Sequence, residues 1–254
     1  MLFDNVADKY LIFKPSSTLV GTPKDLGIEF DDLYFNSTDN VTLHGWFINK
    51  GSVKTIVWIH GNGGNISHRI LSLKNLYDNT KYNIFIFDYR GYGKSEGRVS
   101  ETGTYQDSFS AIEFLNKTYS IHSNQLILFG KSLGCAIACE IASKINPLAL
   151  LLESPFTSAR NMAKFKFPFL PGIEYLISDK FNTGAKIKQI NCPVMFIHGD
   201  SDKTIPIKMA VTLYESYQNT KCFLEANGAG HNNIEQVLGI SYFEQIKSFI
   251  TTNC

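Results

Sequence analysis

Residues 126–138 read LILFGKSLGCAIA and contain two overlapping patterns that predict different enzyme classes. Gly-Lys-Ser at 130–132 is how a phosphate-binding loop ends, whereas Gly-x-Ser-x-Gly centred on Ser132 is the pattern of a nucleophile elbow. A phosphate-binding loop also requires a glycine five residues before Gly130, and that position holds Gln125. The residues between them form an apolar strand, whose backbone N–H groups are committed to a β-ladder. The phosphate-binding interpretation therefore fails.

The nucleophile-elbow interpretation fits its local context. The apolar strand at 126–129 runs directly into a helical pattern that begins near Ser132 and is rich in small residues. Such a tight turn holds the serine in a strained backbone conformation and exposes its Oγ. Glycine is needed on either side because a Cβ there would collide with the neighbouring strand or helix. Ser132 is therefore the candidate nucleophile.

The rest of the chain predicts an α/β fold. Residues 27–35 and 41–48 alternate apolar and polar side chains around a polar turn, which predicts an antiparallel pair with one solvated face. Six further segments are short and almost continuously apolar, as strands buried on both faces are: TIVWIHG, YNIFIFDYRG, QLILFG, LALLLES, PVMFIHG and TKCFLEA. Most of these are separated by helical patterns, at 66–79, 102–119, 205–217 and 234–250. We therefore predict a mostly parallel eight-stranded sheet with an antiparallel N-terminal pair and helices on both faces.

The length of the chain and one long connection define the domain prediction. A chain of 254 residues can bury its core as one domain, so we predict a single domain over residues 1–254. About forty residues separate LALLLES from PVMFIHG, more than a crossover needs. We predict that residues 155–190 form a small cap over the carboxyl ends of the strands, where ligands bind in open α/β sheets. Its Phe167 and Phe169 are candidate substrate-binding residues for an apolar acyl chain.

Composition excludes several classes of function. Hydrophobic residues make up 44% and charged residues 19%, as in an ordinary soluble protein, and the net charge of +1 gives no argument for a nucleic-acid partner. No segment approaches the roughly 18 apolar residues of a membrane span, and the acidic residues Asp4 and Asp8 argue against a signal peptide. The five cysteines lack zinc-ligand spacing. We expect no metal, no membrane span and a cytoplasmic location, with peripheral membrane contact left open.

A serine nucleophile needs a base and a group that orients the base. When a nucleophile elbow lies in an α/β sheet of this kind, the acid follows the serine along the chain and the histidine comes last. His231 follows the last strand in the glycine-rich segment EANGAGHNN, from which it can reach back to Ser132. Asp200 and Asp202 follow PVMFIHG, and Glu153 ends LALLLE, so the residues alone leave the acid open.

An acyl-transfer site also needs two backbone N–H groups where negative charge develops on the substrate oxygen. One comes from the residue after the nucleophile, which is Leu133. The other comes from the loop HGNGGN at 60–65, where Asn62 is the first candidate and Gly63 the second.

Six motifs lie in order along residues 28–250: VWIHGNGGN, FDYRGYGKSEG, LFGKSLGCAIA, LLESPFTSARNMA, PVMFIHGDSDKTIP and GAGHNN. Together they resemble the α/β-hydrolase superfamily and are similar to the group that contains the α/β-hydrolase-domain proteins of type 13 and type 17. The resemblance implies a triad of Ser132, Asp202 and His231, with Asn62 and Leu133 at the oxyanion hole. Asp200 is then a turn residue, and Glu153 is the alternative acid.

The resemblance also implies hydrolysis of carboxylic esters or thioesters without a metal or cofactor. We therefore expect a serine hydrolase acting on a small-molecule or lipid-like acyl substrate. Two alternatives remain at this point. A serine peptidase or amidase uses the same triad, and a non-catalytic binding protein can retain the fold.

Overall fold

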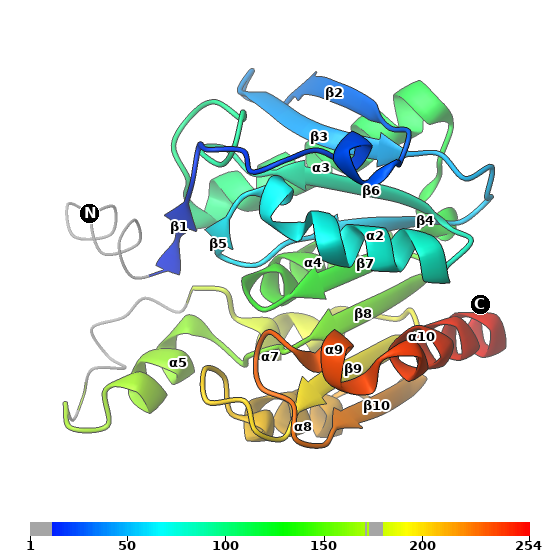
Figure 1. Cartoon of the computed structure of the whole chain (residues 1–254). Helices are drawn as coiled ribbons and strands as arrows, with labels where there is room; N and C mark the ends of the chain where they lie inside the picture. Colours follow the sequence, from blue (N-terminus) through cyan, green and yellow to red (C-terminus); the bar gives the residue numbers. More distant parts are fainter. Residues whose placement is uncertain (1–11, 171, 173–179) are drawn as a thin grey trace. The chain divides into compact units, whose positions relative to one another are not determined.

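The computed structural model describes residues 12–170, 172 and 180–254, and the chain divides into two compact units, residues 1–127 and 128–254 (Figure 1). The prediction that residues 1–254 form a single domain stays a prediction.

The first unit contains a four-stranded array in the order β4-β6-β3-β2. β4 (Thr55–Ile59) is parallel to β6 (Asn83–Asp88), whereas β3 (Thr42–Ile48) is antiparallel to both β6 and β2 (Asp31–Asn36). Helix α2 (Ile70–Asn79) follows β4 and α3 (Glu101–Tyr119) follows β6, and Figure 1 shows them on opposite faces of the strands. The smaller elements are β1 (Lys14–Pro15) paired with β5 (Gly63–Gly64), and the 3-10 helices η2 (Pro23–Leu26), η3 (Ile66–Arg69) and η4 (Ser123–Gln125).

The N-terminal antiparallel pair differs from the prediction in one respect. Four of the six residues of β2 are exposed and only Phe35 is buried, but every residue of β3 from Leu43 to Ile48 is buried. The reason is that β3 is an interior strand covered on both faces. Phe47 packs on Tyr119 of α3, with ring centroids 4.2 Å apart, and Trp46 packs on Phe30 at 5.7 Å. Of the two strands in this pair, only β2 therefore has a solvated face.

The second unit arranges its strands in the order β10-β9-β8-β7. β7 (Leu126–Lys131) begins at the junction of the units, and β8 (Ala149–Glu153), β9 (Val194–Gly199) and β10 (Lys221–Ala226) follow. β9 is parallel to both β8 and β10. Helices α4 (Leu133–Ile145), α8 (Ile207–Ser216), α9 (Ile234–Leu238) and α10 (Ile240–Asn253) surround the strands, with α10 and α8 on opposite faces in Figure 1.

One predicted helix is two helices in the structure. The pattern at 234–250 predicts a continuous helix, but α9 ends at Leu238 and α10 starts at Ile240. Gly239 between them has φ 55° and ψ −133°, a conformation that only glycine adopts without strain. Hydrophobic spacing alone does not reveal this break, because the apolar positions continue on both sides of it.

The connection between β8 and β9 contains α5 (Ala159–Lys166), α7 (Thr183–Lys186) and the 3-10 helix η5 (Ile187–Gln189). Residues 171 and 173–179 of the predicted cap lie outside the described residues. The cap over 155–190 therefore stays a prediction.

The main architecture follows the sequence patterns. The pairs β4–β6, β8–β9 and β9–β10 are parallel, β3 is antiparallel to both of its neighbours, and each unit has helices on both faces of its strands. This arrangement confirms the predicted α/β class with a mostly parallel sheet and an antiparallel N-terminal pair.

Candidate active site

Ser132 occupies a tight turn between β7 and α4 and has φ 54° and ψ −117°. This is a left-handed conformation that non-glycine residues adopt only when the surroundings enforce it. Gly130 explains why the turn closes so tightly. A Cβ on this glycine would lie 2.7 Å from both the Cα of Cys135 and the carbonyl oxygen of Gly134. The predicted strand–turn–helix context of the nucleophile elbow is therefore present.

His231 lies between Ser132 and Asp202 in the second unit. Its Nδ1 is 2.7 Å from Asp202 Oδ2, and its Nε2 is 3.1 Å from Ser132 Oγ. With an ionised Asp202 accepting the Nδ1 proton, Nε2 is left as the acceptor for the serine hydroxyl. The structure thus brings together the serine, histidine and aspartate that the sequence selected.

The Asp202 carboxylate is buried and fully bonded. Oδ1 accepts the backbone N–H groups of Thr204 at 2.7 Å and Ile205 at 2.9 Å, and Oδ2 faces His231 and, at 3.3 Å, Nε2 of His198. Burial alone would raise the pKa of this carboxyl. The hydrogen bonds from His198, His231 and Ile205 outweigh burial and hold the pKa well below its usual value. Asp202 is therefore ionised at neutral pH.

The loop that carries His231 is tied to the turn after β9. Asp200 lies in that turn, as predicted, and its Oδ1 accepts the backbone N–H of Gly228 at 2.7 Å. The Ser201 N–H donates to the carbonyl of Ala229 at 3.0 Å. A Cβ on Gly199 would lie 2.2 Å from that same carbonyl oxygen, so only glycine allows the approach. These contacts fix the position of the loop that carries His231.

Glu153, the alternative acid, is engaged elsewhere. Its carboxylate pairs with Lys131 Nζ at 2.6 Å and accepts the hydroxyl of Tyr242 at 2.5 Å. Sequence reasoning did not select Lys131 or Tyr242. The available signal was a charged residue at the end of a buried strand, which requires a partner. Tyr242 lies 89 residues further along the chain, so no local pattern identifies it as that partner.

The predicted oxyanion-hole residues belong to different units. Leu133 is the first residue of α4 and is buried. Asn62 and Gly63 lie in the first unit, where the Asn62 carbonyl accepts the backbone N–H of Lys14 at 3.0 Å and the hydroxyl of Tyr92 at 2.8 Å. The pairing of Asn62 or Gly63 with Leu133 at one substrate oxygen stays a prediction.

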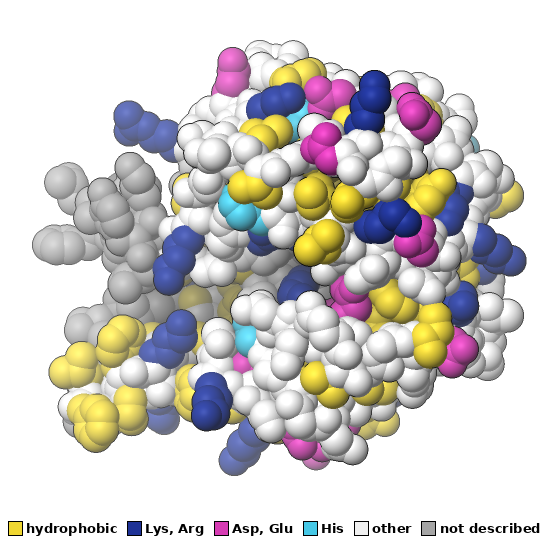
Figure 2. Space-filling view, viewed as in Figure 1, with side chains coloured by type: hydrophobic (Ala, Val, Ile, Leu, Met, Phe, Trp, Pro, Cys, Tyr) yellow, Lys and Arg dark blue, Asp and Glu magenta, His cyan; other side chains and the backbone are white. Residues whose placement is uncertain are grey.

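Phe167 and Phe169 lie just after α5 and are exposed by 42% and 92%. Phe165 and Leu170 are exposed as well, and Figure 2 shows hydrophobic side chains gathered at this end of α5, at the lower left, beside lysine and arginine. The assignment of Phe167 and Phe169 to an acyl-binding pocket stays a prediction.

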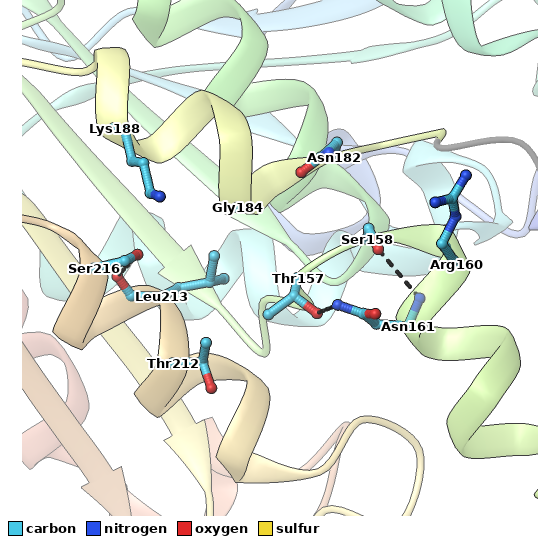
Figure 3. Close-up of a pocket in the computed structure, with 10 residues that line it drawn as sticks. All are labelled: Thr157, Ser158, Arg160, Asn161, Asn182, Gly184, Lys188, Thr212, Leu213 and Ser216. Carbon is cyan, nitrogen blue, oxygen red and sulfur yellow. Dashed lines mark hydrogen bonds between the residues drawn. The ribbon is translucent and has the colours of Figure 1, made fainter. Parts of the chain in front are cut away.

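A separate cavity of about 320 Å³ in the second unit is lined mostly by residues with polar side chains (Figure 3). It is lined by residues from the start of α5, from α7 and η5, and from the second half of α8. Ser132, Asp202 and His231 do not line it. In the described ranges 12–170, 172 and 180–254, no group of three or more His, Cys, Asp or Glu side chains is placed to hold a metal ion.

Comparison with known proteins places the chain in a family. The family model described as serine aminopeptidase, S33, matches residues 51–183. The chain belongs to the α/β-hydrolase superfamily. This membership supports a hydrolase, and it confirms the resemblance to α/β-hydrolase-domain-containing proteins.

Two relatives show how far the similarity extends. The α/β-hydrolase domain-containing protein WAV2 of Arabidopsis thaliana is 32% identical over 83% of this chain and 75% of its own length. Protein bem46 of Schizosaccharomyces pombe is 31% identical over 92% of this chain and 81% of its own length.

Solved structures share the fold. An esterase of Pyrococcus furiosus superimposes with a TM-score of 0.80 at 23% identity, covering 94% of this chain and 98% of the esterase. An α/β hydrolase of Vibrio vulnificus gives a TM-score of 0.75 at 19% identity, over 92% and 88% of the two chains. Among the residues that the structure describes, no helix combines the length and apolarity needed to cross a bilayer.

Proposed function

We propose that the protein is a serine hydrolase that cleaves carboxylic ester or thioester bonds of an acyl substrate. The observation that carries the proposal is the continuous contact from Asp202 through His231 to Ser132, with distances of 2.7 and 3.1 Å. Acyl transfer requires a serine, a base and an orienting acid in this geometry, and a packing role would not require the serine to sit in strained backbone.

In the proposed reaction, Ser132 Oγ attacks the acyl carbonyl carbon while His231 Nε2 takes the hydroxyl proton. The Asp202 carboxylate stabilises the imidazolium that forms and keeps the proton on Nδ1. The negative charge on the former carbonyl oxygen is met by the backbone N–H of Leu133 and, in this proposal, by that of Asn62. His231 then returns its proton to the departing alcohol or thiol, which leaves an acyl-enzyme on Ser132.

Water completes the cycle. His231 Nε2 takes a proton from a water molecule, whose oxygen attacks the acyl-enzyme, and the same proton returns to Ser132 Oγ as the acid leaves. Each step moves one proton between His231 Nε2 and either Ser132 Oγ, the leaving group or water. The proton transfers of both halves of the reaction therefore run through one residue, His231.

The test is intact mass after incubation with a fluorophosphonate, for wild type and Ser132→Ala. We expect one adduct on the wild type and none on the variant, with kcat for esters lowered by about 10⁴- to 10⁶-fold in the variant. A Ser132→Ala protein that keeps more than a tenth of the activity would exclude Ser132 as the nucleophile. A folded wild type that takes no adduct would favour the non-catalytic alternative.

The family match favours a second candidate, a peptidase or amidase, because the matching model is described as a serine aminopeptidase. The triad itself does not separate an amide from an ester. A panel of acyl esters, acyl thioesters and aminoacyl amides, assayed with unlabelled wild-type enzyme, separates the two candidates. A kcat/KM higher for the amides would replace the ester or thioester assignment.

A further inference from the structure

The Glu153 carboxylate forms a buried polar network with Lys131 and Tyr242, next to the nucleophile elbow. Its side chain is 3% exposed, although it ends β8 near the site. Lys131 Nζ lies 2.6 Å from Oε1, and the Tyr242 hydroxyl donates to Oε2 at 2.5 Å. The acyl-transfer steps use none of these three side chains.

The backbone of Glu153 holds the other side of the elbow. Its carbonyl oxygen accepts the N–H of Ser132 at 2.8 Å and the thiol of Cys135 at 3.1 Å. One residue therefore contacts the position before the nucleophile, the nucleophile itself and the first turn of α4. Through Tyr242 it also connects these positions to α10.

The strain at Ser132 makes such support necessary. A serine at φ 54° keeps that conformation only while its surroundings over-determine it. A buried carboxylate is costly to leave partly bonded, so Lys131 and Tyr242 fix the Glu153 side chain in one position. With the side chain fixed, its carbonyl presents one acceptor to the Ser132 N–H and restrains the turn.

We propose that Glu153, held between Lys131 and Tyr242, is a positioning residue that keeps Ser132 Oγ aligned with His231. The inference rests on the proposed function of Ser132. It assigns the alternative acid of the sequence analysis a different role, in which it acts through the backbone of the nucleophile and not on the imidazole.

Glu153→Gln and Tyr242→Phe test the proposal with little change in shape. Misplacing a reacting atom by about 1 Å can cost about 100-fold in rate, so we expect kcat to fall between 10- and 100-fold with KM within about twofold. The double variant should lose little more than either single variant, because both changes disrupt one network. Phe249→Leu, a change of a buried residue on the same helix α10, is the control for general destabilisation.

A second readout does not depend on activity. Cys135 and Cys139 are both fully buried on α4, and only Cys135 has its thiol bonded to the Glu153 carbonyl. Alkylation with N-ethylmaleimide, followed by fragment-ion mass spectrometry, reports the opening of each site. In both variants we expect Cys135 to react at least about 10-fold faster than in wild type, with Cys139 unchanged.

The outcomes separate this inference from the proposed function. The inference is overturned if the variants keep wild-type kcat and Cys135 reactivity, or if Phe249→Leu loses as much kcat as they do. A wild type that takes no fluorophosphonate adduct would defeat the proposed function instead. Even then, faster alkylation of Cys135 in the two variants than in wild type, with Cys139 unchanged, would show that Glu153 restrains the elbow.

Discussion

The Asp200 carboxylate accepts the backbone N–H of Gly228 at 2.7 Å and so joins the turn after β9 to the loop that carries His231. Asp202, two residues further along, is the acid that contacts the imidazole. One short turn therefore sets both the orientation of the histidine ring and the position of its loop.

Asp200→Ala should lower kcat for ester substrates by about 10-fold with little change in KM, because His231 loses part of its support. Asp200→Asn keeps an oxygen that can accept the Gly228 N–H and should recover most of the loss. The measurement is steady-state kinetics on a short, soluble ester. Equal activity in wild type and Asp200→Ala would mean that the other loop contacts are sufficient.

Phe167→Ala and Phe169→Ala, made together, should lower kcat/KM for long acyl chains more than for acetyl esters. A long chain gains binding energy from apolar area that an acetyl group lacks, by about 0.8 kcal/mol for each buried CH₂. A chain-length series of esters measures the difference. Leu71→Ala on α2, where the side chain is 69% exposed, is the matched control. An equal loss on short and long chains would remove the acyl-pocket assignment.

Gly130→Ala should destabilise the protein, by about 1–3 kcal/mol or more, because the added methyl meets the backbone of α4 at 2.7 Å. Backbone atoms cannot rotate away as a side chain can. Gly184→Ala is the control, since its Cβ would lie 3.6 Å or more from its nearest neighbours. Denaturant unfolding compares the two. Equal free energies of unfolding for the two variants would show that the elbow can relax around a methyl group.

Asp88 should make stability depend on pH. Burial raises the pKa of this carboxyl to about 7, against the partial compensation of the Ile66 N–H and the Arg69 charge. Because the folded pKa exceeds the unfolded value of about 3.9, the folded state binds the proton more tightly, and stability is lost as pH rises from about 4 to 7. The loss contributed by Asp88 is on the order of 4 kcal/mol, since each pKa unit corresponds to about 1.4 kcal/mol.

Asp88→Asn removes the titrating group while keeping an acceptor for the Ile66 N–H, which donates to Oδ1 at 2.9 Å. The free energy of unfolding of the variant should therefore fall less between pH 4 and pH 7 than that of wild type. Urea unfolding at several pH values measures both slopes. Parallel curves would show that folding does not raise the pKa of Asp88.

The sequence predicts those parts of the fold and site that depend on local pattern. The strand, the glycines and the small residues around Ser132 lie within one short segment, so the elbow can be recognised without tertiary information. The buried strands are equally visible as apolar runs. The burial of β3 is not visible in this way, because Tyr119, which covers one of its faces, lies about 70 residues further along the chain, in α3.

The choice among acids shows where local reasoning ends. Asp200 and Asp202 follow β9 and Glu153 ends the neighbouring parallel strand β8, and only the family resemblance selects Asp202 among them. The structure separates them by partner: Gly228 for Asp200, His231 for Asp202, and Lys131 with Tyr242 for Glu153. Those partners lie far along the chain, and a single sequence carries no record of such distances.

The strained backbone at Ser132 lowers thermal stability at the residue that the proposed activity requires. Its φ of 54° with ψ of −117° is a combination that glycine enters freely, whereas a residue with a Cβ is strained there by about 1–3 kcal/mol. Ser132→Gly should therefore melt at a higher temperature than Ser132→Ala, although both lack the nucleophile. Selecting variants of this chain for thermal survival alone would favour loss of the serine, so a directed-evolution campaign must screen for activity in every round.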